Sequence, residues 1–464
     1  MAEVGRIDKD APWRVALTSP SPYSVAMSSL GLQCIYGILQ SLPGVSAERV
    51  FLPDSAREPP LSYERLRPLA EFPVVALSVA YELELAGLVR LLDAAGLPLW
   101  ASERDERHPL LLAGGPLTFG NALPLGPFAD AVVLGEGEGV LEAVMNTLRS
   151  SRRRSDALSE LARLGHVWVP GLGGKPPSLA RADDTRLPAK SVIRTPYAEL
   201  SDMFLVEVER GCSRSCRYCV MRRERSGGMR LVPRDVILAS IPADARRVGL
   251  VGAAVSDHPD LPRILETLAA RGCEVGVSSL RPERLSSELV SALGRAGGRT
   301  LTTALDGASE KLRETLGRHV RNEDLVEAAR LARAHGFSRL KLYLMLGLPG
   351  ETDEDVDDCA RLLSELSRTV SVALTVSPFC AKAGTPLAHA PFAGVGLLGA
   401  RLERLRRRLK GRVDVRSASP KWAWVEHVLS TGAEPEAGAV AEAALAGGRF
   451  SDYRRAFGRL GHVA

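Results

Sequence analysis

The sequence predicts an α/β protein that begins with a doubly wound parallel sheet, continues into a partial (β/α) barrel and ends in a small helical region. Apolar segments of strand length alternate with helical patterns along most of the 464 residues, and such alternation is typical of parallel sheets. The segment 166–200, rich in proline, glycine and charge, separates two such series and is interpreted as a linker. We therefore place the domains at residues 1–165, 201–390 and 391–464.

The first series contains apolar segments that helical patterns follow. The expected strands are residues 14–19, 72–79, 109–115 and 130–135, and the expected helices are residues 25–42, 84–96 and 139–148. This alternation predicts a Rossmann/flavodoxin-like sheet, whose ligands bind at the carboxyl ends of the strands. The loops that follow these strands are rich in glycine, serine and proline. We therefore expect a ligand to bind at these loops.

The second series contains six apolar segments of strand length, with helical patterns between them. The expected strands are residues 204–209, 246–252, 273–279, 299–305, 339–347 and 370–379. Six βα repeats after a sheet domain predict a (β/α)6 barrel, which is a partial version of the eightfold barrel. In such barrels the chemistry lies on the loops that follow the strands.

The last segment, residues 391–464, is predicted to be mainly helical. Leu398, Leu402, Leu405 and Leu409 recur at helical spacing. Arginines lie between these leucines. They either form a solvated helix face or bind the phosphates of an RNA partner, and the sequence leaves both interpretations open.

The composition favours a globular protein of the cytoplasm. The chain is 45% hydrophobic and 25% charged, and no run of about 18 apolar residues predicts a membrane span. The first residues lack the apolar region of a secretory signal. In the cytoplasm thiols stay reduced, so clustered cysteines there bind metal or react. A net charge of +5 would help an anionic partner approach but identifies none.

Three of the seven cysteines, Cys212, Cys216 and Cys219, lie in a CxxxCxxC loop directly after the first strand of the second series. Three soft thiolates in one short loop suit an iron–sulfur cluster. They can hold three irons of a four-iron cluster and leave the fourth open for chemistry. A zinc site with three cysteines and one histidine is disfavoured, because the nearest downstream histidine, His258, is almost forty residues away.

Several motifs, in order along the chain, resemble those of the radical SAM superfamily between about residues 200 and 390. They are the cysteine loop with Tyr218 before its last cysteine, then GLVGAAVSDHP, SSLRPE, ALDGASEKLR and LMLGLPGETDED. The resemblance implies that the three cysteines hold a [4Fe–4S] cluster and that S-adenosylmethionine (SAM) binds the open iron. The residues implied to contact SAM are Tyr218, Gly252, Ser278, Ser279, Arg281, Asp306, Gly347, Gly350 and Glu351.

Two of these positions depart from the pattern of the superfamily. Gly252 and Ala253 stand where Gly-Gly-Glu is common, so the third, polar residue of that motif is missing. Asp306 stands where many relatives have glutamate, which keeps the carboxylate but shortens its reach. Both departures concern contacts with SAM and leave the cysteine loop unchanged.

The resemblance also implies a reaction and a partner. One electron from the reduced cluster cleaves the carbon–sulfur bond of SAM, giving methionine and a 5′-deoxyadenosyl radical, while the protein orients the cofactors and excludes water. The electron would come from a donor such as flavodoxin or ferredoxin. Arginines crowd the cluster loop, and they either dock such an acidic donor or stay solvated. The substrate stays open between a small molecule, a peptide and RNA, and no catalytic side chain is singled out.

The first domain resembles the cobalamin-binding domain that one branch of the superfamily carries, and the similarity to uncharacterised bacterial members of that branch extends over nearly the whole chain. The residues implied to meet cobalamin are Ser19, Tyr23, Ser78, Gly114, Gly115, Asn121, Gly135, Gly137 and Glu138. Glycines at strand ends would let the backbone approach a bulky ligand. The DxHxxG motif that supplies a histidine to cobalt is absent. The alternative is a sheet domain that only shapes the substrate cavity.

Three functions follow from these observations. The leading one is a cobalamin-linked radical SAM methyltransferase that acts at an unactivated carbon. The alternative is a cobalamin-independent radical SAM enzyme that modifies RNA, similar to methylthiotransferases. Those enzymes usually carry three more cysteines in the N-terminal domain, where this chain has only Cys34. A non-catalytic carrier of nucleotide or corrinoid is disfavoured by the complete cysteine triplet.

Overall fold

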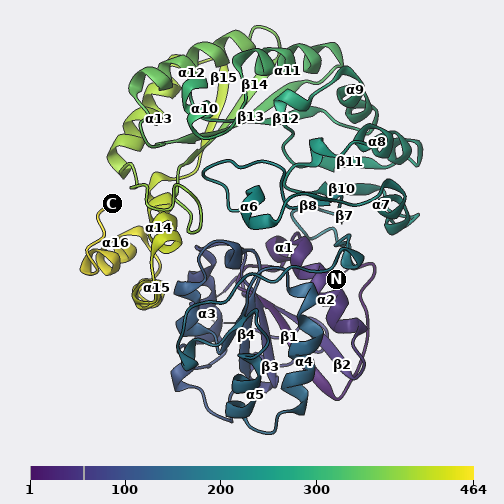
Figure 1. Ribbon diagram of the computed structural model, residues 1–464, viewed down its shortest axis with the longest axis vertical. Coiled ribbons are helices and arrows are strands. Elements are labelled where there is room, and N and C mark those ends of the chain that lie inside the picture. Colours follow the sequence, from purple (N-terminus) through teal and green to yellow (C-terminus); the bar gives the residue numbers. More distant parts are fainter. Residues whose placement is uncertain (1, 56–57) are drawn as a thin grey trace. The chain divides into compact units, whose positions relative to one another are not determined.

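The computed structural model describes residues 2–55 and 58–464, and the contacts among these residues divide them into two compact units (Figure 1). Unit 1 comprises the residues up to Asp202 together with Val428–Val463, and unit 2 comprises Met203–His427. The expected boundary between residues 200 and 201 lies two residues from this division. The expected C-terminal region is instead shared between the units.

Unit 1 is built on a mainly parallel sheet, which confirms the predicted fold class. The strands lie in the order β2-β1-β3-β4-β5-β6, and β6 is antiparallel to its neighbour β5. Their bounds are β1 Trp13–Ser19, β2 Val45–Phe51, β3 Val74–Ser78, β4 Leu110–Gly114, β5 Ala131–Val133 and β6 Val167–Trp168. In this flavodoxin-like order the topological switch point, where such sheets bind ligands, lies between β1 and β3.

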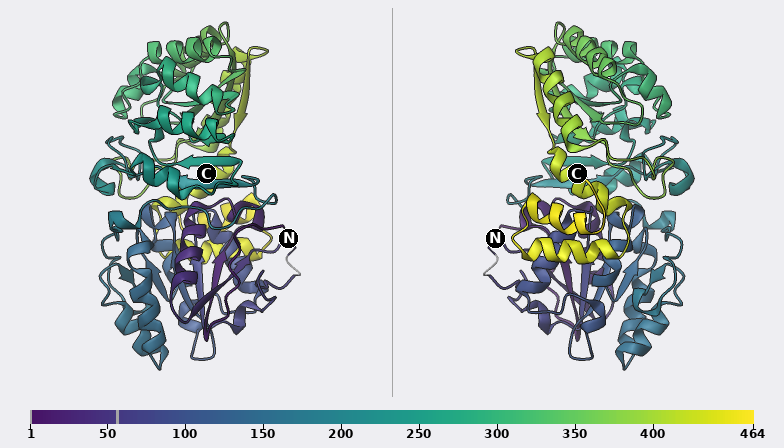
Figure 2. Two further views of the ribbon diagram at one scale, coloured as in Figure 1. Left: turned by 90° about the vertical axis from the view of Figure 1, so that its right-hand side faces the viewer. Right: turned by 90° about the vertical axis from the view of Figure 1, so that its left-hand side faces the viewer.

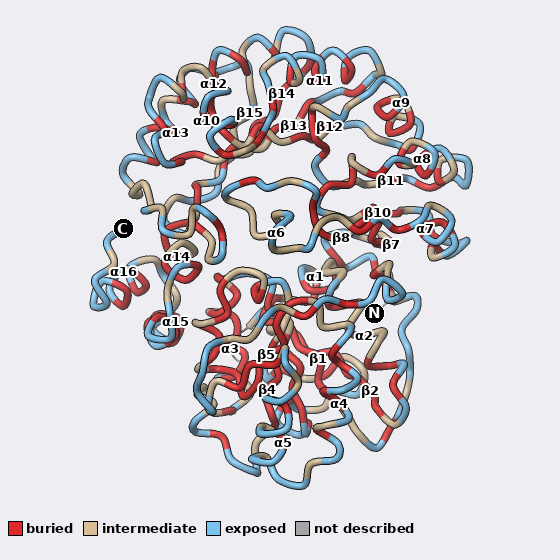
Figure 3. Tube along the Cα trace, in the orientation of Figure 1, coloured by how far each residue is buried: buried red, intermediate tan, exposed pale blue. Residues whose placement is uncertain are grey.

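Helices connect these strands and bury the sheet, so that the strands of unit 1 are red in Figure 3. Their bounds are α1 Tyr23–Ala26, α2 Leu30–Ser41, α3 Glu84–Ala94, α4 Leu141–Ser150 and α5 Arg154–Leu161. The helix expected at residues 25–42 is interrupted between α1 and α2. There the side chain of Ser29 caps α2 by accepting a hydrogen bond from the backbone N–H of Leu32 at 3.3 Å.

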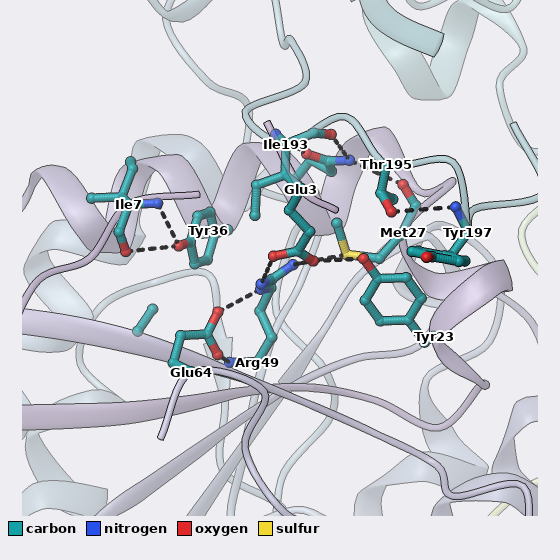
Figure 4. A network of polar contacts seen from close by, with 12 residues as sticks. Glu3, Ile7, Tyr23, Met27, Tyr36, Arg49, Glu64, Ile193, Thr195 and Tyr197 are labelled. Carbon is teal, nitrogen blue, oxygen red and sulfur yellow. Dashed lines mark hydrogen bonds and ion pairs between the residues drawn. The ribbon is translucent and has the colours of Figure 1, made fainter. Parts of the chain in front are cut away.

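A buried ion network joins the N-terminal segment to β2 (Figure 4). The guanidinium of Arg49, 1% exposed, contacts the carboxylate of Glu3 at 2.8 Å and that of Glu64 at 2.6 Å. The hydroxyl of Tyr23 donates a hydrogen bond to Glu3 at 2.5 Å, and burial together with this contact raises the pKa of Tyr23 to about 12. The charge of Arg49 is therefore compensated inside the protein by two carboxylates.

The helices at the C-terminal end of the chain complete unit 1. They are α15 Pro435–Leu445 and α16 Phe450–Arg459, which pack side by side, as the right-hand view of Figure 2 shows. Helix α15 packs against α3. The side-chain amide of Asn121 donates hydrogen bonds to the carbonyl oxygens of Leu429 at 3.0 Å and Gly432 at 2.7 Å. A segment from the end of the chain thus covers part of the first domain.

Unit 2 contains the strands of the predicted partial barrel, all in parallel pairs. Their bounds are β7 Met203–Glu207, β10 Arg247–Val251, β11 Glu274–Val277, β12 Thr300–Asp306, β13 Arg339–Leu346, β14 Ser371–Pro378 and β15 Val413–Ser417. They form the sheets β11-β10-β7 and β12-β13-β14-β15, which a parallel bridge between Leu280 and Thr303 connects. The six expected strands are confirmed, and β15 is an additional strand.

Helices cover the outer face of this sheet, and α11 and α13 pack against β13. The bounds of the helices in unit 2 are α7 Arg234–Ser240, α8 Leu261–Ala270, α9 Ser287–Arg295, α10 Glu310–Thr315, α11 Asn322–Ala334, α12 Asp353–Leu366 and α13 Val395–Leu409. Helix α14 Pro420–Thr431 begins in unit 2, and its residues from Val428 on belong to unit 1. Along β13 buried residues alternate with half-buried ones. The inner face of this central strand is therefore only partly covered, unlike the packed interior of a closed eightfold barrel.

Arginines of α13 contact acidic residues of α12 and of the loop before it. Arg404 contacts Asp357 at 2.8 Å, and Arg408 contacts the same carboxylate at 2.8 Å. These ion pairs give the two arginines a role in packing α13 against α12, so they favour a structural interpretation over RNA binding at this face. Among residues 2–55 and 58–464, no helix combines the length and the apolar character that a membrane span requires.

Candidate functional site

The cysteine loop begins at the carboxyl end of β7 and is closed at its base. A short antiparallel pair, β8 Glu209–Arg210 and β9 Arg230–Leu231, holds the two ends of the loop together. Next to this pair Gly211 has φ +82°, and a Cβ there would lie 2.2 Å from the carbonyl oxygen of Gly228. Only glycine allows the backbone at residue 211 to pass this close to Gly228. The glycine directly before Cys212 is therefore needed to close the base of the loop.

The three cysteines of the loop are free thiols, and Cys212 and Cys216 lie near enough to Cys219 to affect its ionisation. Cys212 and Cys216 are each 8% exposed and Cys219 is half-buried. Burial raises the pKa of Cys216. Burial also raises the pKa of Cys219 to about 11, and the neighbouring sulfurs of Cys216 and Cys212 add to this effect. A bound metal stabilises such thiols as thiolates. The donor set therefore fits a [4Fe–4S] cluster.

In the described part of the chain, no group of three or more His, Cys, Asp or Glu side chains converges on one metal ion.

The turn after α10 supports the middle of the cysteine loop. The backbone N–H of Arg217 donates a hydrogen bond to the carbonyl oxygen of Leu316 at 2.9 Å. The thiol of Cys216 donates to the carbonyl oxygen of Gly317 at 3.7 Å. These contacts join two segments that lie about a hundred residues apart in the sequence. The turn therefore fixes the position of the second cysteine.

Asp306 lies at the end of β12 in a strained conformation. Its φ of +62° is uncommon for a residue other than glycine, and the register between β12 and β13 shifts beside it. Such strain persists where the surroundings impose it and is frequent at functional sites. The carboxylate of Asp306 forms an ion pair with Arg318, a residue that the sequence motifs did not single out.

Tyr218 lies beside this ion pair and against an apolar cluster. Burial first, and then the nearby Asp306 and Cys216, raise the pKa of Tyr218 well above its ordinary value. Although burial alone lowers the pKa of Arg318, the carboxylates of Asp306 and Glu283 raise it above its ordinary value. The apolar cluster contains Leu316, Leu348, Phe379 and Ala381, with Met345, Leu387 and Ala390 packed against it. The structure thus brings together Tyr218, Asp306 and a thiol of the loop.

Gly252 lies at the end of β10, directly against a buried carboxylate. A Cβ at Gly252 would lie 2.3 Å from Oε1 of Glu209. This oxygen accepts a hydrogen bond from the backbone N–H of Ala254 at 2.5 Å, whereas Oε2 is buried without a hydrogen-bond partner among the described residues. Burial raises the pKa of Glu209 to about 7. The sequence motifs did not single out Glu209, which lies at the end of the expected strand 204–209.

The residues expected after β11 occupy different environments. The hydroxyl of Ser278 donates a hydrogen bond to the carbonyl oxygen of Gly252 at 3.3 Å, and Ser279 is exposed. The guanidinium of Arg281 is buried and donates from Nη2 to Sγ of Cys212 at 3.1 Å. Of these three residues, Arg281 is in direct contact with the cysteine loop.

The turn after β13 is stabilised from within the protein. Oε1 of Glu351 accepts hydrogen bonds from the backbone N–H of Gly347 and from Arg401, each at 2.9 Å. Gly347 has φ +88°, and a Cβ there would lie 2.7 Å from a methyl carbon of Leu398. Gly350 also has a positive φ, +77°, with open space around it. These contacts explain the motif through packing, and its contact with SAM stays a prediction.

Several residues of unit 1 that were expected to meet a ligand are engaged by the chain itself. A Cβ at Gly115 would lie 2.6 Å from the carbonyl oxygen of Val79, and one at Gly135 would lie 2.5 Å from that of Ala180. The glycines allow the chain to approach itself closely at these two positions. Tyr23 and Asn121 use their polar groups in the contacts described above. The contacts within the chain account for these four residues, and their contact with cobalamin stays a prediction.

The other expected residues of unit 1 lie at or near the same strand ends. Ser78, Gly114, Gly137 and Glu138 are half-buried. Ser19 is buried, and its hydroxyl accepts a hydrogen bond from the backbone N–H of Ser21 at 3.4 Å. These residues lie at or near the carboxyl ends of β3, β4 and β5, and their contact with a ligand stays a prediction.

Comparisons of sequence with known families agree with this arrangement. The family model described as "Radical SAM proteins, N-terminal" matches residues 31–170. The one described as "Radical SAM superfamily" matches residues 206–363, which run from the end of β7 through the cysteine loop to beyond β13.

The individual relatives that match are between 24% and 28% identical to this chain. The chain is 24% identical over 382 residues to an uncharacterized protein of Methanocaldococcus jannaschii, covering 80% of this chain and 78% of that one. It is 25% identical over 250 residues to the tRNA-2-methylthio-N(6)-dimethylallyladenosine synthase of Deinococcus radiodurans, covering 50% and 49%. It is 28% identical over 232 residues to the ribosomal protein uS12 methylthiotransferase RimO of Saccharopolyspora erythraea, covering 46% and 44%. The chain thus spans about half the length of these two enzymes.

A solved structure shares the fold over both units. It is the cobalamin-dependent S-adenosylmethionine radical enzyme OxsB with aqua-cobalamin bound. The match has a TM-score of 0.54 at 14% sequence identity and covers 85% of this chain and 56% of that one. At this identity the likeness concerns the fold. Together with the family matches and the cysteine loop, it leads to one assignment. The chain belongs to the radical SAM superfamily and carries an extra N-terminal domain.

Proposed function

We propose that this radical SAM enzyme binds a [4Fe–4S] cluster through Cys212, Cys216 and Cys219 and cleaves SAM at the carboxyl end of its barrel. The observation that carries this proposal is the set of three free thiols on the loop after β7, two of them buried and one half-buried. When bound, the cluster would supply the electron that opens the carbon–sulfur bond of SAM. The protein's own contribution is to orient and enclose the reactants.

The side chains around the loop would perform this contribution. The apolar cluster that packs around Tyr218 excludes water from one side of the site, which strengthens the charge interactions inside it. The ion pair between Asp306 and Arg318 holds a carboxylate beside the thiol of Cys216. We propose that Asp306 and Glu209, whose Oε2 is buried and unpartnered, are the acidic groups that face the cationic parts of SAM.

SAM cleavage is the direct test of this site. Anaerobically reconstituted protein with dithionite and SAM is expected to release 5′-deoxyadenosine, S-adenosylhomocysteine or both, as measured by liquid chromatography of the quenched reaction. S-adenosylhomocysteine would indicate transfer of a methyl group. A variant with Cys219→Ala serves as the control, because it removes one cluster ligand and leaves the other two. Equal release from that variant would contradict the proposed site.

We further propose that the N-terminal unit binds cobalamin and that the reaction transfers a methyl group to an unactivated carbon. This proposal is supported by the sheet order of unit 1 and by the fold that it shares with a cobalamin-dependent enzyme. The residues that would meet the ligand are the half-buried ones at the carboxyl ends of β3 to β5, namely Ser78, Gly114, Gly137 and Glu138.

A binding experiment tests the cobalamin proposal separately from the cluster. Purified protein mixed with hydroxocobalamin and passed through a desalting column is expected to retain the corrin absorption band in about one equivalent per chain. Gly114→Val would place a branched side chain beside Val133, so this variant is expected to retain less. Passage of the protein without the band would contradict the proposal and leave the SAM cleavage site unaffected.

An enzyme similar to methylthiotransferases is the second candidate. It is favoured by the relatives of that class that match about half of this chain. Iron content distinguishes the candidates, because a second cluster would raise it from about four to about eight atoms per chain. Before residue 200 the sequence has only Cys34, so we expect the lower value. The higher value would favour the methylthiotransferase interpretation.

A further inference from the structure

The sulfur of Cys212 receives hydrogen bonds from two donors. Nη2 of Arg281 lies 3.1 Å from it, and the backbone N–H of Arg214 lies 3.4 Å from it. Arg214 belongs to the cysteine loop itself, whereas Arg281 comes from the loop after β11, which is 69 residues away in the sequence. The fold thus brings a side chain from another strand to one particular thiol of the three.

Two further contacts hold Arg281 in this position. Its Nη1 forms an ion pair with Oδ2 of Asp257 at 2.9 Å, and its backbone N–H donates a hydrogen bond to the hydroxyl of Ser256 at 3.0 Å. The side chains of Arg281 and Asp257 are 7% and 5% exposed. Both ends of the guanidinium are therefore engaged, one with the carboxylate and one with the sulfur.

Asp257 also contacts the cysteine loop. Its Oδ2 accepts a hydrogen bond from the hydroxyl of Ser213 at 3.1 Å, and Ser213 directly follows Cys212. On the solvent side Arg284, with its side chain 54% exposed, lies 3.5 Å from Oδ1 of Asp257. Asp257 lies in the loop after β10, and its carboxylate thus connects this loop with the loop after β11 and with the cysteine loop.

A buried guanidinium beside a cluster ligand has a defined electronic effect. Arginine stays charged and offers only donors. A hydrogen bond to a cysteine sulfur withdraws electron density from it, and hydrogen bonds to the sulfurs are among the factors that set the potential of an iron–sulfur cluster. The positive charge acts in the same direction, because the reduced cluster is more negative by one electron. Low exposure keeps the charge from being screened.

We propose that Arg281 raises the reduction potential of the cluster by donating to the sulfur of Cys212, and that Asp257 is the positioning residue that holds it there. The proposal rests on the proposed cluster at the three cysteines. In the step concerned, one electron passes from a low-potential one-electron donor to the oxidised cluster, and Arg281 neither gains nor loses a proton. This role differs from the contact with SAM that the sequence resemblance implies for Arg281.

The test is the potential of the cluster in the reconstituted full-length protein, measured by titration with dithionite and followed by electron paramagnetic resonance. In Arg281→Met the ratio of reduced to oxidised cluster at a fixed solution potential is expected to fall about tenfold, which corresponds to a shift of about −59 mV. Arg284→Gln is the matched control. It also removes a cation that contacts Asp257, but this cation is exposed to solvent and does not contact the sulfur of Cys212. Its ratio is expected to change less than about twofold. An unchanged ratio in Arg281→Met would overturn the proposal.

Asp257→Asn tests the positioning role by the sign of its effect. If Asp257 only contributed its negative charge, removing that charge would raise the potential. If it holds Arg281 on the sulfur, the substitution is expected to lower the potential, and to lower it no further when Arg281→Met is also present. A higher potential in Asp257→Asn, or full additivity in the double variant, would overturn the role of Asp257.

Iron content separates failure of this inference from failure of the proposed function. Wild-type protein that binds no iron would contradict the proposed cluster. Protein that binds about four irons per chain but shows an unchanged potential in Arg281→Met would contradict only the role of Arg281. If Arg281→Met does not take up iron, the potential of Arg281→Lys tests the proposal instead. Lysine keeps the positive charge but lacks the planar set of N–H donors of the guanidinium. A fall of at least about twofold in its ratio would support the proposal, and no fall would overturn it.

Discussion

Replacing Cys216 with alanine is expected to reduce the iron content of reconstituted protein from about four atoms per chain to below about one. Cys216 is the central cysteine of the loop, 8% exposed and held against the turn after α10. Its loss leaves two thiolates, which cannot retain a cluster that has three protein ligands. Iron is measured by colorimetric assay, and the visible absorption of the cluster is expected to disappear with it.

Cys359 provides the matched control for this experiment. It lies in α12, is 0% exposed, and burial raises its pKa to about 12, so it is an inert thiol of the core. Cys359→Ala is expected to keep its full iron content and to lose about 1 kcal/mol of stability through the small cavity. Equal iron in the Cys216 and Cys359 variants would show that the cluster lies elsewhere.

Replacing Arg49 with methionine is expected to lower the free energy of unfolding of unit 1 by about 3–5 kcal/mol. The substitution leaves the carboxylates of Glu3 and Glu64, only 5% and 7% exposed, without their shared cation. A buried uncompensated charge costs more than the ion pair contributes, because desolvation is no longer offset. The loss is measured in the unfolding transition of unit 1 during urea titration, followed by circular dichroism.

Two further variants serve as controls for Arg49→Met. Arg14→Met removes an exposed ion pair with Asp10, whose side chain is 61% exposed, and is expected to change stability by less than about 1 kcal/mol. Adding Glu3→Gln and Glu64→Gln to Arg49→Met is expected to recover a large part of the loss, because no buried carboxylate remains. A loss below about 1 kcal/mol in Arg49→Met would contradict the network's role.

The fold class and the six strands of the barrel could be predicted because each strand contains several apolar residues, either in a run or alternating with polar ones. Strand β2 was not expected, although all its residues are buried, because it contains Glu48 and Arg49. Those charges find partners only after residues far away in the sequence have packed against them. Strand β15 was not expected either, because its residues Val413–Ser417 alternate with charge in a segment of helical pattern.

The cysteine loop could be predicted from spacing alone, but its surroundings could not. Arg318, Asp257 and Glu209 lie next to the loop through contacts between strand ends, and the sequence motifs, one of which includes Asp257, gave none of the three a role. The glycines of unit 1 show the opposite difficulty. Gly115 and Gly135 indicate a close approach of backbone, but a glycine does not say whether its neighbour is a ligand or the chain itself.

Helices α15 and α16 belong to unit 1 but are translated after unit 2, and this order affects how unit 1 folds during translation. Unit 1 lacks the segment Val428–Val463 until the intervening Met203–His427 has been translated, which takes roughly 10–45 s at about 5–20 residues per second. During that interval α3 has no covering helix and the amide of Asn121 has no carbonyl partners from Leu429 and Gly432. The nascent first domain therefore stays incomplete until the last residues emerge, and a nascent-chain chaperone has its longest opportunity to bind at α3.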